Sequence, residues 1–271
     1  MKLRLYLFIA LFSQSFTVHA ERVVIAGGTL TDIVFAIGAG DQVVAIDTSS
    51  TSPARAQSLP KVGYYRDLAA EGVLSQSPTL VLTLEGSGRP EVLTQLRSTG
   101  VRVTHYPKPT QVKELFALIE RLGNDLNKQH NARALIRKLQ QQLPDKAAPT
   151  HNKAMFILSA SERGVLVAGT DTVPDILFGY TGIENLATEA GFKPYNIESL
   201  VSANPDFIVA PSHTVESLGG AEKFCQLPAL ALLSAAQECR LLVMDSLISI
   251  GMTSRLPEAI AQLSAFQREM L

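Results

Sequence analysis

The sequence predicts an α/β protein of two lobes, each with a parallel-type sheet, joined by a single long interlobe helix. Three observations support this fold class. Apolar, β-branched runs alternate with helical patterns along the chain, which is typical of parallel strands covered by helices. One long helical stretch interrupts this alternation near the middle, and a short segment of the first half recurs in the second. The length of 271 residues suffices for two lobes of ordinary size.

Residues 1–20 are expected to form a cleavable signal peptide that lies outside the fold. Lys2 and Arg4 precede the apolar run LYLFIALF, and small residues lead up to Ala20, after which we expect cleavage. Neither this run nor any later segment reaches the roughly 20 apolar residues that a membrane-spanning helix needs. The mature chain is therefore expected to be soluble and periplasmic.

The elements of the two lobes follow from β-branched runs and from helical spacing. In the first lobe, residues 21–124, we expect strands at Arg22–Ala26, Gln42–Ile46, Thr79–Thr83 and Val101–His105, and helices at Leu30–Ile37 and Arg89–Ser98. In the second lobe, residues 146–271, we expect strands at Ala154–Ser159, Asp206–Ala210 and Arg240–Asp245, and helices at Thr172–Tyr180, Val215–Cys225 and Leu256–Gln267.

Two helices are expected between the lobes. Thr110 can cap the first, whose apolar residues recur at helical spacing over Val112–Leu122. The interlobe segment, residues 125–145, is then expected to be one helix from about Leu126 to Leu143. Because its apolar stripe is narrow, we expect this helix to bridge the lobes across solvent.

An internal repeat supports two related lobes. Residues 71–82 read EGVLSQSPTLVL and residues 198–209 read ESLVSANPDFIV, so Glu, Ser and Pro recur at the same offsets. Each copy is expected to form a short helix, a turn containing proline and a buried strand. Two related lobes joined by one helix predict a ligand cleft between them.

Composition and motifs argue against several classes of function. Lys and Arg number 24 against 25 Asp and Glu, so the chain has no basic field for nucleic acid or an anionic membrane. The glycine pair in IAGGTLTD lacks the spacing of a phosphate-binding loop, and the GSG at residues 86–88 lacks the frame of a catalytic serine. We therefore expect a binding protein for a small molecule and no enzyme, with a secreted hydrolase as a remote alternative.

The histidines form no recognisable metal-binding motif. His105, His130, His151 and His213 are far apart and lie outside the HxxxH and HExxH frames. His213 follows a strand of the second lobe and is the histidine best placed to meet a ligand, although a solvated loop histidine is the simpler interpretation.

Cys225 and Cys239 are the two cysteines of the chain. In an oxidising compartment we expect a disulfide between them, and two separate buried thiols are the alternative. A disulfide closing a loop of this size would stabilise the fold by about 3 kcal/mol.

The loop before the first repeat copy carries the most specific motif. The segment PKVGYYRDLAAEGVLSQSPTLVL resembles the periplasmic haem-binding proteins of bacterial ABC haem importers, within the wider class of siderophore- and cobalamin-binding proteins. The resemblance extends through RVVIAGGTLTDIVFAIGAG, LVAGTDTVPDILFGYTGIENLA and YNIESLVSANPDFIVA, and so over almost all of the mature chain. It implies a two-lobed periplasmic binding protein whose ligand is haem b, with a ferric siderophore or a corrinoid as the alternative.

The resemblance implies roles for the GYxR element. In that family the tyrosine ligates the haem iron and the arginine supports the site, and the matching residues are Tyr64 and Arg66. A phenolate is a hard oxygen donor suited to ferric iron, and a guanidinium can stabilise the phenolate or pair with a haem propionate. Some family members add a histidine near the turn that here reads LSASERGVLVAG, which contains none. Tyr64 is therefore expected to be the only protein ligand of the iron.

Further contacts are weaker expectations. Tyr65 could replace Tyr64, and His213 could approach from the opposite lobe. Arg255 resembles a family arginine near the cleft, which implies a second propionate partner.

The repeated glutamates have an implied partner. In the wider class, one surface glutamate on each lobe docks onto arginines of the membrane permease, and the matching residues are Glu71 and Glu198. A glutamate that stabilises a helix N-terminus is the alternative, and both roles can hold together. The resemblance thus implies a monomer that delivers haem to the permease dimer of an ABC importer in the inner membrane, for iron acquisition.

Overall fold

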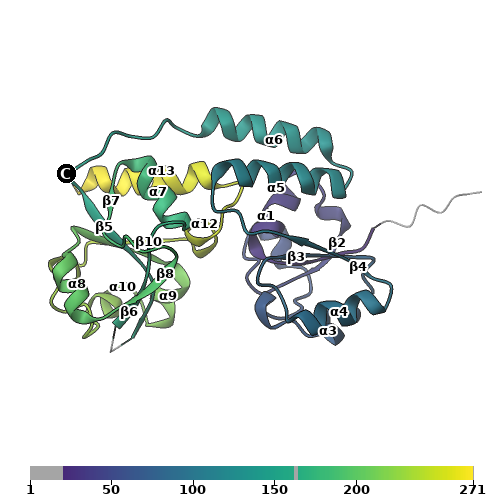
Figure 1. The fold of residues 1–271 in the computed structure, drawn as a ribbon, viewed down its shortest axis with the longest axis horizontal. Helices are drawn as coiled ribbons and strands as arrows, with labels where there is room; N and C mark the ends of the chain where they lie inside the picture. The colour runs from purple at the N-terminus through teal and green to yellow at the C-terminus, as the bar shows by residue number, and fades with distance from the viewer. Residues whose placement is uncertain (1–20, 162–163, 271) are drawn as a thin grey trace, which may run out of the picture.

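Four parallel strands form the sheet of the first lobe (Figure 1). The computed structural model describes residues 21–161 and 164–270, so the expected signal peptide at residues 1–20 lies outside the described residues. The strands are β1 (Val23–Ala26), β2 (Val43–Ile46), β3 (Leu80–Leu84) and β4 (Arg102–Tyr106), in the order β2-β1-β3-β4. Every residue of β1 and β3 is buried, which explains why these strands read as continuous apolar runs. All four overlap the predicted strands.

The sheet of the second lobe is mixed, where the sequence predicted a parallel-type sheet. Its strands are β5 (Lys153–Ser161), β6 (Gly164–Ala168), β7 (Glu184–Asn185), β8 (Phe192–Tyr195), β9 (Phe207–Pro211) and β10 (Leu241–Met244). Strands β5, β9 and β10 are parallel neighbours, as expected, but β6 pairs antiparallel with both β5 and β8. The prediction missed β6, β7 and β8.

Helices cover both faces of each sheet. In the first lobe they are α1 (Gly28–Ala36), α2 (Ala54–Gln57), α3 (Ala70–Leu74) and α4 (Pro90–Ser98), with short 3₁₀ turns at Gly40–Gln42 and Tyr65–Asp67. In the second lobe they are α7 (Val173–Thr181), α8 (Ile197–Ala203), α9 (Ser212–Ser217), α10 (Ala221–Cys225), α11 (Ser234–Gln237), α12 (Ser246–Ile250) and α13 (Leu256–Glu269). One face of the first sheet carries α1 and α5 (Val112–Asp125), and the other carries α3 and α4 (Figure 1).

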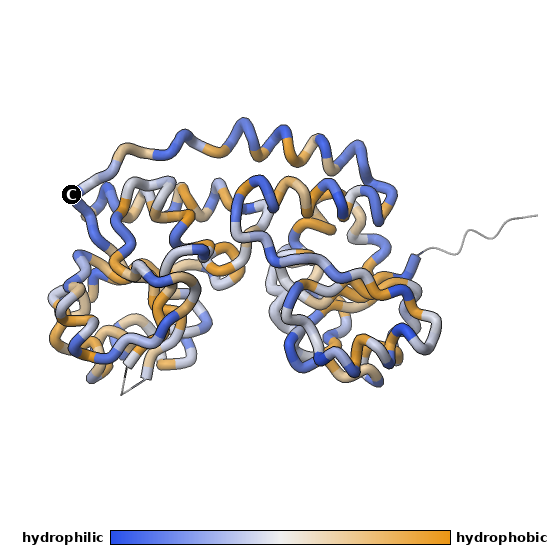
Figure 2. Tube along the Cα trace, in the orientation of Figure 1, coloured by the Kyte–Doolittle hydropathy of each residue, from blue (hydrophilic) through white to orange (hydrophobic). Residues whose placement is uncertain are grey.

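The connection between the lobes differs in detail from the prediction. It consists of α5 (Val112–Asp125) and α6 (Gln129–Gln142), which lie side by side, and then an extended segment that reaches β5 (Figure 1). Helix α6 begins at Gln129, whereas the predicted interlobe helix begins at about Leu126. It is polar along most of its length (Figure 2), as its narrow apolar stripe predicted, and of its residues only Ala132 and Leu139 are buried.

Two local details of the helices correct the prediction. Gln111, and not Thr110, occupies the N-cap of α5, while the Thr110 amide and hydroxyl both donate to Glu114 Oε2. The helix expected at Val215–Cys225 is broken into α9 and α10, because Gly219 and Gly220 adopt φ values of 90° and 106° that interrupt a helix.

The two copies of the repeat form equivalent structures. Each begins with a short helix, α3 or α8, and continues through a proline-containing turn into a central strand, β3 or β9. Ser77 and Asn204, which immediately precede the two prolines, have similar left-handed φ values of 48° and 45°. The strand orders β1-β3-β4 and β5-β9-β10 match as well, so the repeat predicted from the sequence is confirmed.

A single apolar core connects the lobes. It includes Ile33 of α1, Ile119 of α5, Leu177 of α7 and Ile260 of α13, all buried. Separate apolar clusters fill the opposite faces of the two sheets. Glycine is required at position 28, since a Cβ there would lie 2.6 Å from the backbone oxygen of Ser49 and 2.8 Å from Leu247 Cδ1 of the second lobe.

A buried carboxylate joins the lobes at this junction. Asp32 of α1 accepts a hydrogen bond from the Ser254 amide of the second lobe, with an oxygen to nitrogen distance of 2.7 Å. Burial raises the pKa of Asp32, against the opposing effect of the hydrogen bonds from Ser254 and of the Arg255 charge. The ionised form of Asp32 is therefore disfavoured by the fold.

Asp32→Asn is expected to make the protein more stable than wild type at neutral and alkaline pH, but not at acid pH. Because the folded pKa of Asp32 lies above its unfolded pKa, ionisation begins to destabilise the wild type as the pH rises past about 4, and the effect is complete above the folded pKa. Asparagine keeps an oxygen acceptor for Ser254 without the charge. Thermal unfolding from pH 3 to 8 tests this, and parallel pH profiles for the two proteins would contradict it.

The cysteines of the second lobe are joined. Cys225 and Cys239 form a disulfide with a Cα to Cα distance of 5.5 Å and a sequence separation of 14 residues. It connects the end of α10 to the segment that leads into β10. Within the described parts of the chain, no helix is both long and apolar enough to cross a membrane.

Candidate ligand-binding site

Loops at the carboxyl edge of the first sheet are held together by a buried aspartate. Asp47 follows β2 and is completely buried. Its carboxylate accepts hydrogen bonds from the Gly27 amide at 3.0 Å, the Ser49 amide at 2.8 Å and the Ser50 hydroxyl at 2.7 Å. The loop after β1 is thereby fixed to the loop after β2, on the edge where α/β proteins bind ligands.

Tyr64 lies in the next loop along this edge, and its phenol is accessible. The loop is anchored on one side by the Thr48 amide, which donates to Gly63 O at 2.9 Å, and on the other by the Gly88 amide, which donates to Tyr65 O at 2.8 Å. Tyr64 is 45% exposed, an unusual fraction for a large aromatic residue outside an interface. The fixed backbone and open side chain suit a ligand-contacting residue.

Arg66 supports the Tyr64 phenol directly. The Arg66 guanidinium donates a hydrogen bond of 3.3 Å to Tyr64 Oη, and its carbon lies 5.1 Å from the centre of the Tyr65 ring. A positive charge is thereby placed at the Tyr64 oxygen. The structure thus brings together the three residues of the motif that the sequence singled out.

Tyr65 is less suited than Tyr64 to bind a metal ion. Its ring packs edge-to-face against Tyr64, with 4.8 Å between the ring centres. Burial is the main cause that raises the pKa of Tyr65 to about 12, and the Arg66 charge opposes this shift only in part. Phenolate formation at neutral pH is therefore disfavoured at Tyr65.

Lys108, which belongs to no sequence motif, is close enough to Arg66 for the two charges to interact. It follows β4, and its amide donates to Glu85 Oε2 of the loop after β3 at 3.2 Å. Lys108 and Thr110 line a cavity of about 210 Å³ together with Asp171, Phe192 and other residues of the second lobe. The one signal available in the sequence was its position directly after a strand of the sheet.

His213 is occupied by local hydrogen bonds. It lies at the start of α9, after β9, and its Nδ1 is 2.8 Å from Ser246 Oγ. Its Nε2 is 3.3 Å from Thr214 Oγ1, so both ring nitrogens have partners. Burial lowers the pKa of His213 and favours the neutral imidazole. A role as a second contact would require these hydrogen bonds to rearrange.

Arg255 also has hydrogen-bond and ion-pair partners within the second lobe. Its guanidinium forms two hydrogen bonds to Glu258, of 2.8 Å and 2.6 Å, and lies 3.8 Å from Asp245. These carboxylates raise the pKa of Arg255, the hydrogen bond to Glu258 having the largest effect. The expected propionate contact would therefore compete with an existing bidentate ion pair.

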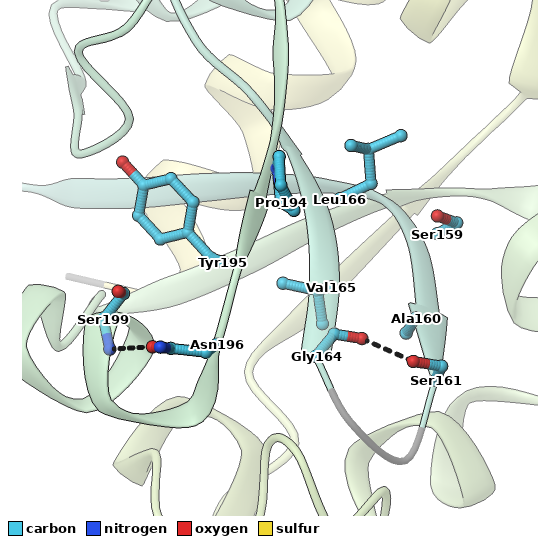
Figure 3. A pocket seen from close by; sticks show the side chains of 10 residues that line it. All are labelled: Ser159, Ala160, Ser161, Gly164, Val165, Leu166, Pro194, Tyr195, Asn196 and Ser199. Atoms are coloured by element: carbon cyan, nitrogen blue, oxygen red, sulfur yellow. Dashed lines mark hydrogen bonds between the residues drawn. The ribbon is translucent and has the colours of Figure 1, made fainter.

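An open hollow of about 580 Å³ lies wholly within the second lobe (Figure 3). Its lining comes from the β5 and β6 hairpin, β8 and the start of α8: Ser159, Ala160, Ser161, Gly164, Val165, Leu166, Pro194, Tyr195, Asn196 and Ser199. In Figure 3 the Tyr195 phenol points away from the end of the hairpin, and the Ser199 amide donates to Asn196 at 2.9 Å. This hollow shares no lining residue with the interlobe cavity, and its described lining contains no histidine.

The two glutamates of the repeat are exposed on separate lobes. Glu71 lies in the first turn of α3 and Glu198 in the first turn of α8 (Figure 1). Both positions also suit stabilisation of a helix N-terminus. Among the described residues, no group of three or more His, Cys, Asp or Glu side chains forms a metal site.

Comparison with known proteins places these features in a family. A solved periplasmic haem-binding protein from Pseudomonas aeruginosa is 33% identical, with a TM-score of 0.82 over 90% of this chain and 91% of that one. A vitamin B12-binding protein from Vibrio parahaemolyticus serotype O3:K6 is 25% identical over 235 residues, 84% of this chain and 85% of the relative. An uncharacterised ABC transporter substrate-binding lipoprotein from Bacillus subtilis is 28% identical over 188 residues, 66% of this chain and 60% of the relative.

These relatives bind substrates and are not enzymes, in agreement with the prediction of a binding protein. The solved haem-binding protein shares the fold described above. The family model for periplasmic binding proteins matches residues 23–247, which include both sheets and the helices between them. The chain therefore belongs to the periplasmic binding protein family.

Proposed function

We propose that this protein captures haem in the periplasm and delivers it to the permease of an ABC importer, without chemical turnover. The observation that carries the proposal is the exposed Tyr64 phenol with the Arg66 guanidinium 3.3 Å from its oxygen. A phenolate held in this way is a suitable axial ligand for ferric iron. The similarity to a haem-binding protein over nine-tenths of the chain supports the same ligand.

The iron is proposed to take Tyr64 as its single protein ligand. The hairpin between β5 and β6 contributes no histidine from its described residues, and both ring nitrogens of His213 are already hydrogen-bonded. The porphyrin faces would be covered by apolar walls of the two lobes, as is usual for large planar ligands.

A corrinoid is the second candidate ligand, because a B12-binding relative matches 84% of the chain. Corrinoids carry neutral amide groups around the ring, and their cobalt already has ring and axial ligands. A corrinoid site therefore has no need of an exposed phenol beside a guanidinium. This difference in chemistry favours haem over a corrinoid.

Parallel titrations distinguish these ligands. Purified protein lacking residues 1–20 would be titrated with hemin, cyanocobalamin and a ferric siderophore, each followed by quenching of intrinsic tyrosine fluorescence and by isothermal calorimetry. We expect saturable binding of one or more hemin molecules and none of the other two ligands. Saturable binding of cyanocobalamin without hemin would assign the corrinoid function instead.

A further inference from the structure

The charges of two cations, Arg66 and Lys108, act on one another, and Arg66 contacts the Tyr64 phenol. Arg66 comes from the loop that the Gly88 amide anchors, and Lys108 from the loop that is joined to Glu85. Arg66 lies between α2 and α3, whereas Gly88 and Lys108 lie in the loops after the neighbouring strands β3 and β4. Neither Arg66 nor Lys108 forms an ion pair with any carboxylate in residues 21–161 and 164–270.

The charges of these groups act on one another. Burial lowers the pKa of Lys108, and the positive charge of Arg66 lowers it further, while Glu85 opposes both. Two like charges at short range repel each other, and an anion placed between them would relieve the repulsion. A bound anion would therefore reduce the repulsion between the charges of Arg66 and Lys108.

Lys108 also faces the space between the lobes. It lines the interlobe cavity with Asp171, Phe192 and Ile250 of the second lobe. Asp171 is the acidic residue that faces Lys108 across this cavity, yet the two form no ion pair. Lys108 is thus a cation that lines the space between the lobes.

We propose that Lys108 binds a propionate carboxylate of haem and, together with Arg66, selects tetrapyrroles that carry free carboxylates. This inference rests on the proposed haem-binding function and identifies the part of the ligand that the site recognises. A lysine ammonium suits this task because it is a compact charge on a flexible stem. Arg66 remains hydrogen-bonded to Tyr64 and supplies the second positive charge.

The proposed role of Lys108 predicts that haem and its neutral analogues bind with different affinities. Hemin dimethyl ester keeps the iron and the porphyrin but has no free carboxylate. Lys108 would therefore form no ion pair with it. If Lys108 instead paired with Asp171 when the lobes close, its loss would weaken both ligands equally. The two interpretations therefore predict different selectivity.

The test measures the affinities of hemin and hemin dimethyl ester, in one detergent-containing buffer, for wild type and three variants. Lys108→Met is expected to weaken hemin binding about tenfold, because a charge-assisted hydrogen bond is lost, and to leave the affinity for the ester unchanged. Lys108→Arg keeps the charge and should retain most of the affinity for hemin. Lys113→Met, on the exposed surface of α5, is the matched control and should change neither affinity.

Each outcome bears on the proposal. Equal weakening of both ligands by Lys108→Met, or no weakening of hemin, would overturn the role of Lys108 while the haem-binding function stands. Failure of the Lys108→Arg variant to retain affinity would point to packing and not to charge, and would also overturn it. If the wild type binds neither porphyrin, the proposed function and this inference both fall.

Discussion

Reversal of both repeat glutamates, Glu71→Lys with Glu198→Lys, is expected to abolish haem uptake while haem binding stays intact. The two carboxylates are exposed, one on each lobe, and occupy equivalent places in the two repeat copies. A two-fold symmetric permease would present the same basic patch twice, so one acidic group on each lobe complements it. Reversing both charges turns two attractions into two repulsions. Either single reversal should reduce uptake only in part.

Uptake would be measured in proteoliposomes that contain the cognate permease, with hemin-loaded binding protein added outside and ATP present inside. The matched control is Glu91→Lys with Glu222→Lys, which reverses one exposed charge on a helix of each lobe away from the repeat positions. This control should support normal uptake. Uptake that survives reversal of Glu71 and Glu198 would show that docking does not depend on these carboxylates.

Tyr64→Phe is expected to cause the largest loss of hemin affinity of any single substitution in the site. It removes the oxygen that would bind iron and leaves the ring and the anchored loop in place. Arg66→Ala removes only the donor to that oxygen, so its loss should be smaller, at about tenfold or more. Tyr65→Phe is the matched control, because burial holds the pKa of Tyr65 near 12 and keeps its phenol neutral.

Equilibrium titrations with hemin would rank these variants. The expected order of affinity is wild type equal to Tyr65→Phe, then Arg66→Ala, then Tyr64→Phe. Apolar contacts of the porphyrin should leave some binding even without Tyr64. A Tyr65→Phe variant that loses more affinity than Tyr64→Phe would move the iron ligand to Tyr65.

The parallel framework of the fold was predictable from the sequence because its strands are buried on both faces. Strands such as β3, in which every residue is buried, produce an unbroken apolar run that can be recognised without knowledge of its neighbours. The repeat was predictable for a similar reason, since each copy contains its own helix, turn and strand. Local patterns of this kind depend little on tertiary contacts.

The elements that the sequence missed depend on contacts between distant residues. Strand β8 (Phe192–Tyr195) carries lysine and proline and is a strand only because it pairs with β6. The crossing of α5 and α6 likewise depends on Gly123, where a Cβ would lie 2.4 Å from Ala132 Cβ. The partner of β8, and the close approach of α5 to α6 at a glycine, cannot be identified from the pattern of either segment alone.

The candidate site was predictable only in part. Tyr64, Tyr65 and Arg66 are adjacent in sequence, so a short motif was enough to find them. Lys108 is linked to them through the loop after β3, in which Gly88 contacts Tyr65 and Glu85 contacts the Lys108 amide. Asp47 fixes the loops after β1 and β2 through four hydrogen bonds. Residues of this kind can be identified only from the structure, in which the loops at the sheet edge contact one another.

Resonance Raman spectroscopy of the ferric hemin complex, excited in the tyrosinate-to-iron charge-transfer region, would show whether Tyr64 ligates the haem iron. The account predicts enhanced tyrosinate modes in the wild type and in Tyr65→Phe, and their disappearance in Tyr64→Phe. The claim rests on the accessible Tyr64 oxygen beside Arg66. A wild-type hemin complex without tyrosinate modes, or a Tyr64→Phe complex that keeps them, would contradict ligation of haem iron by Tyr64.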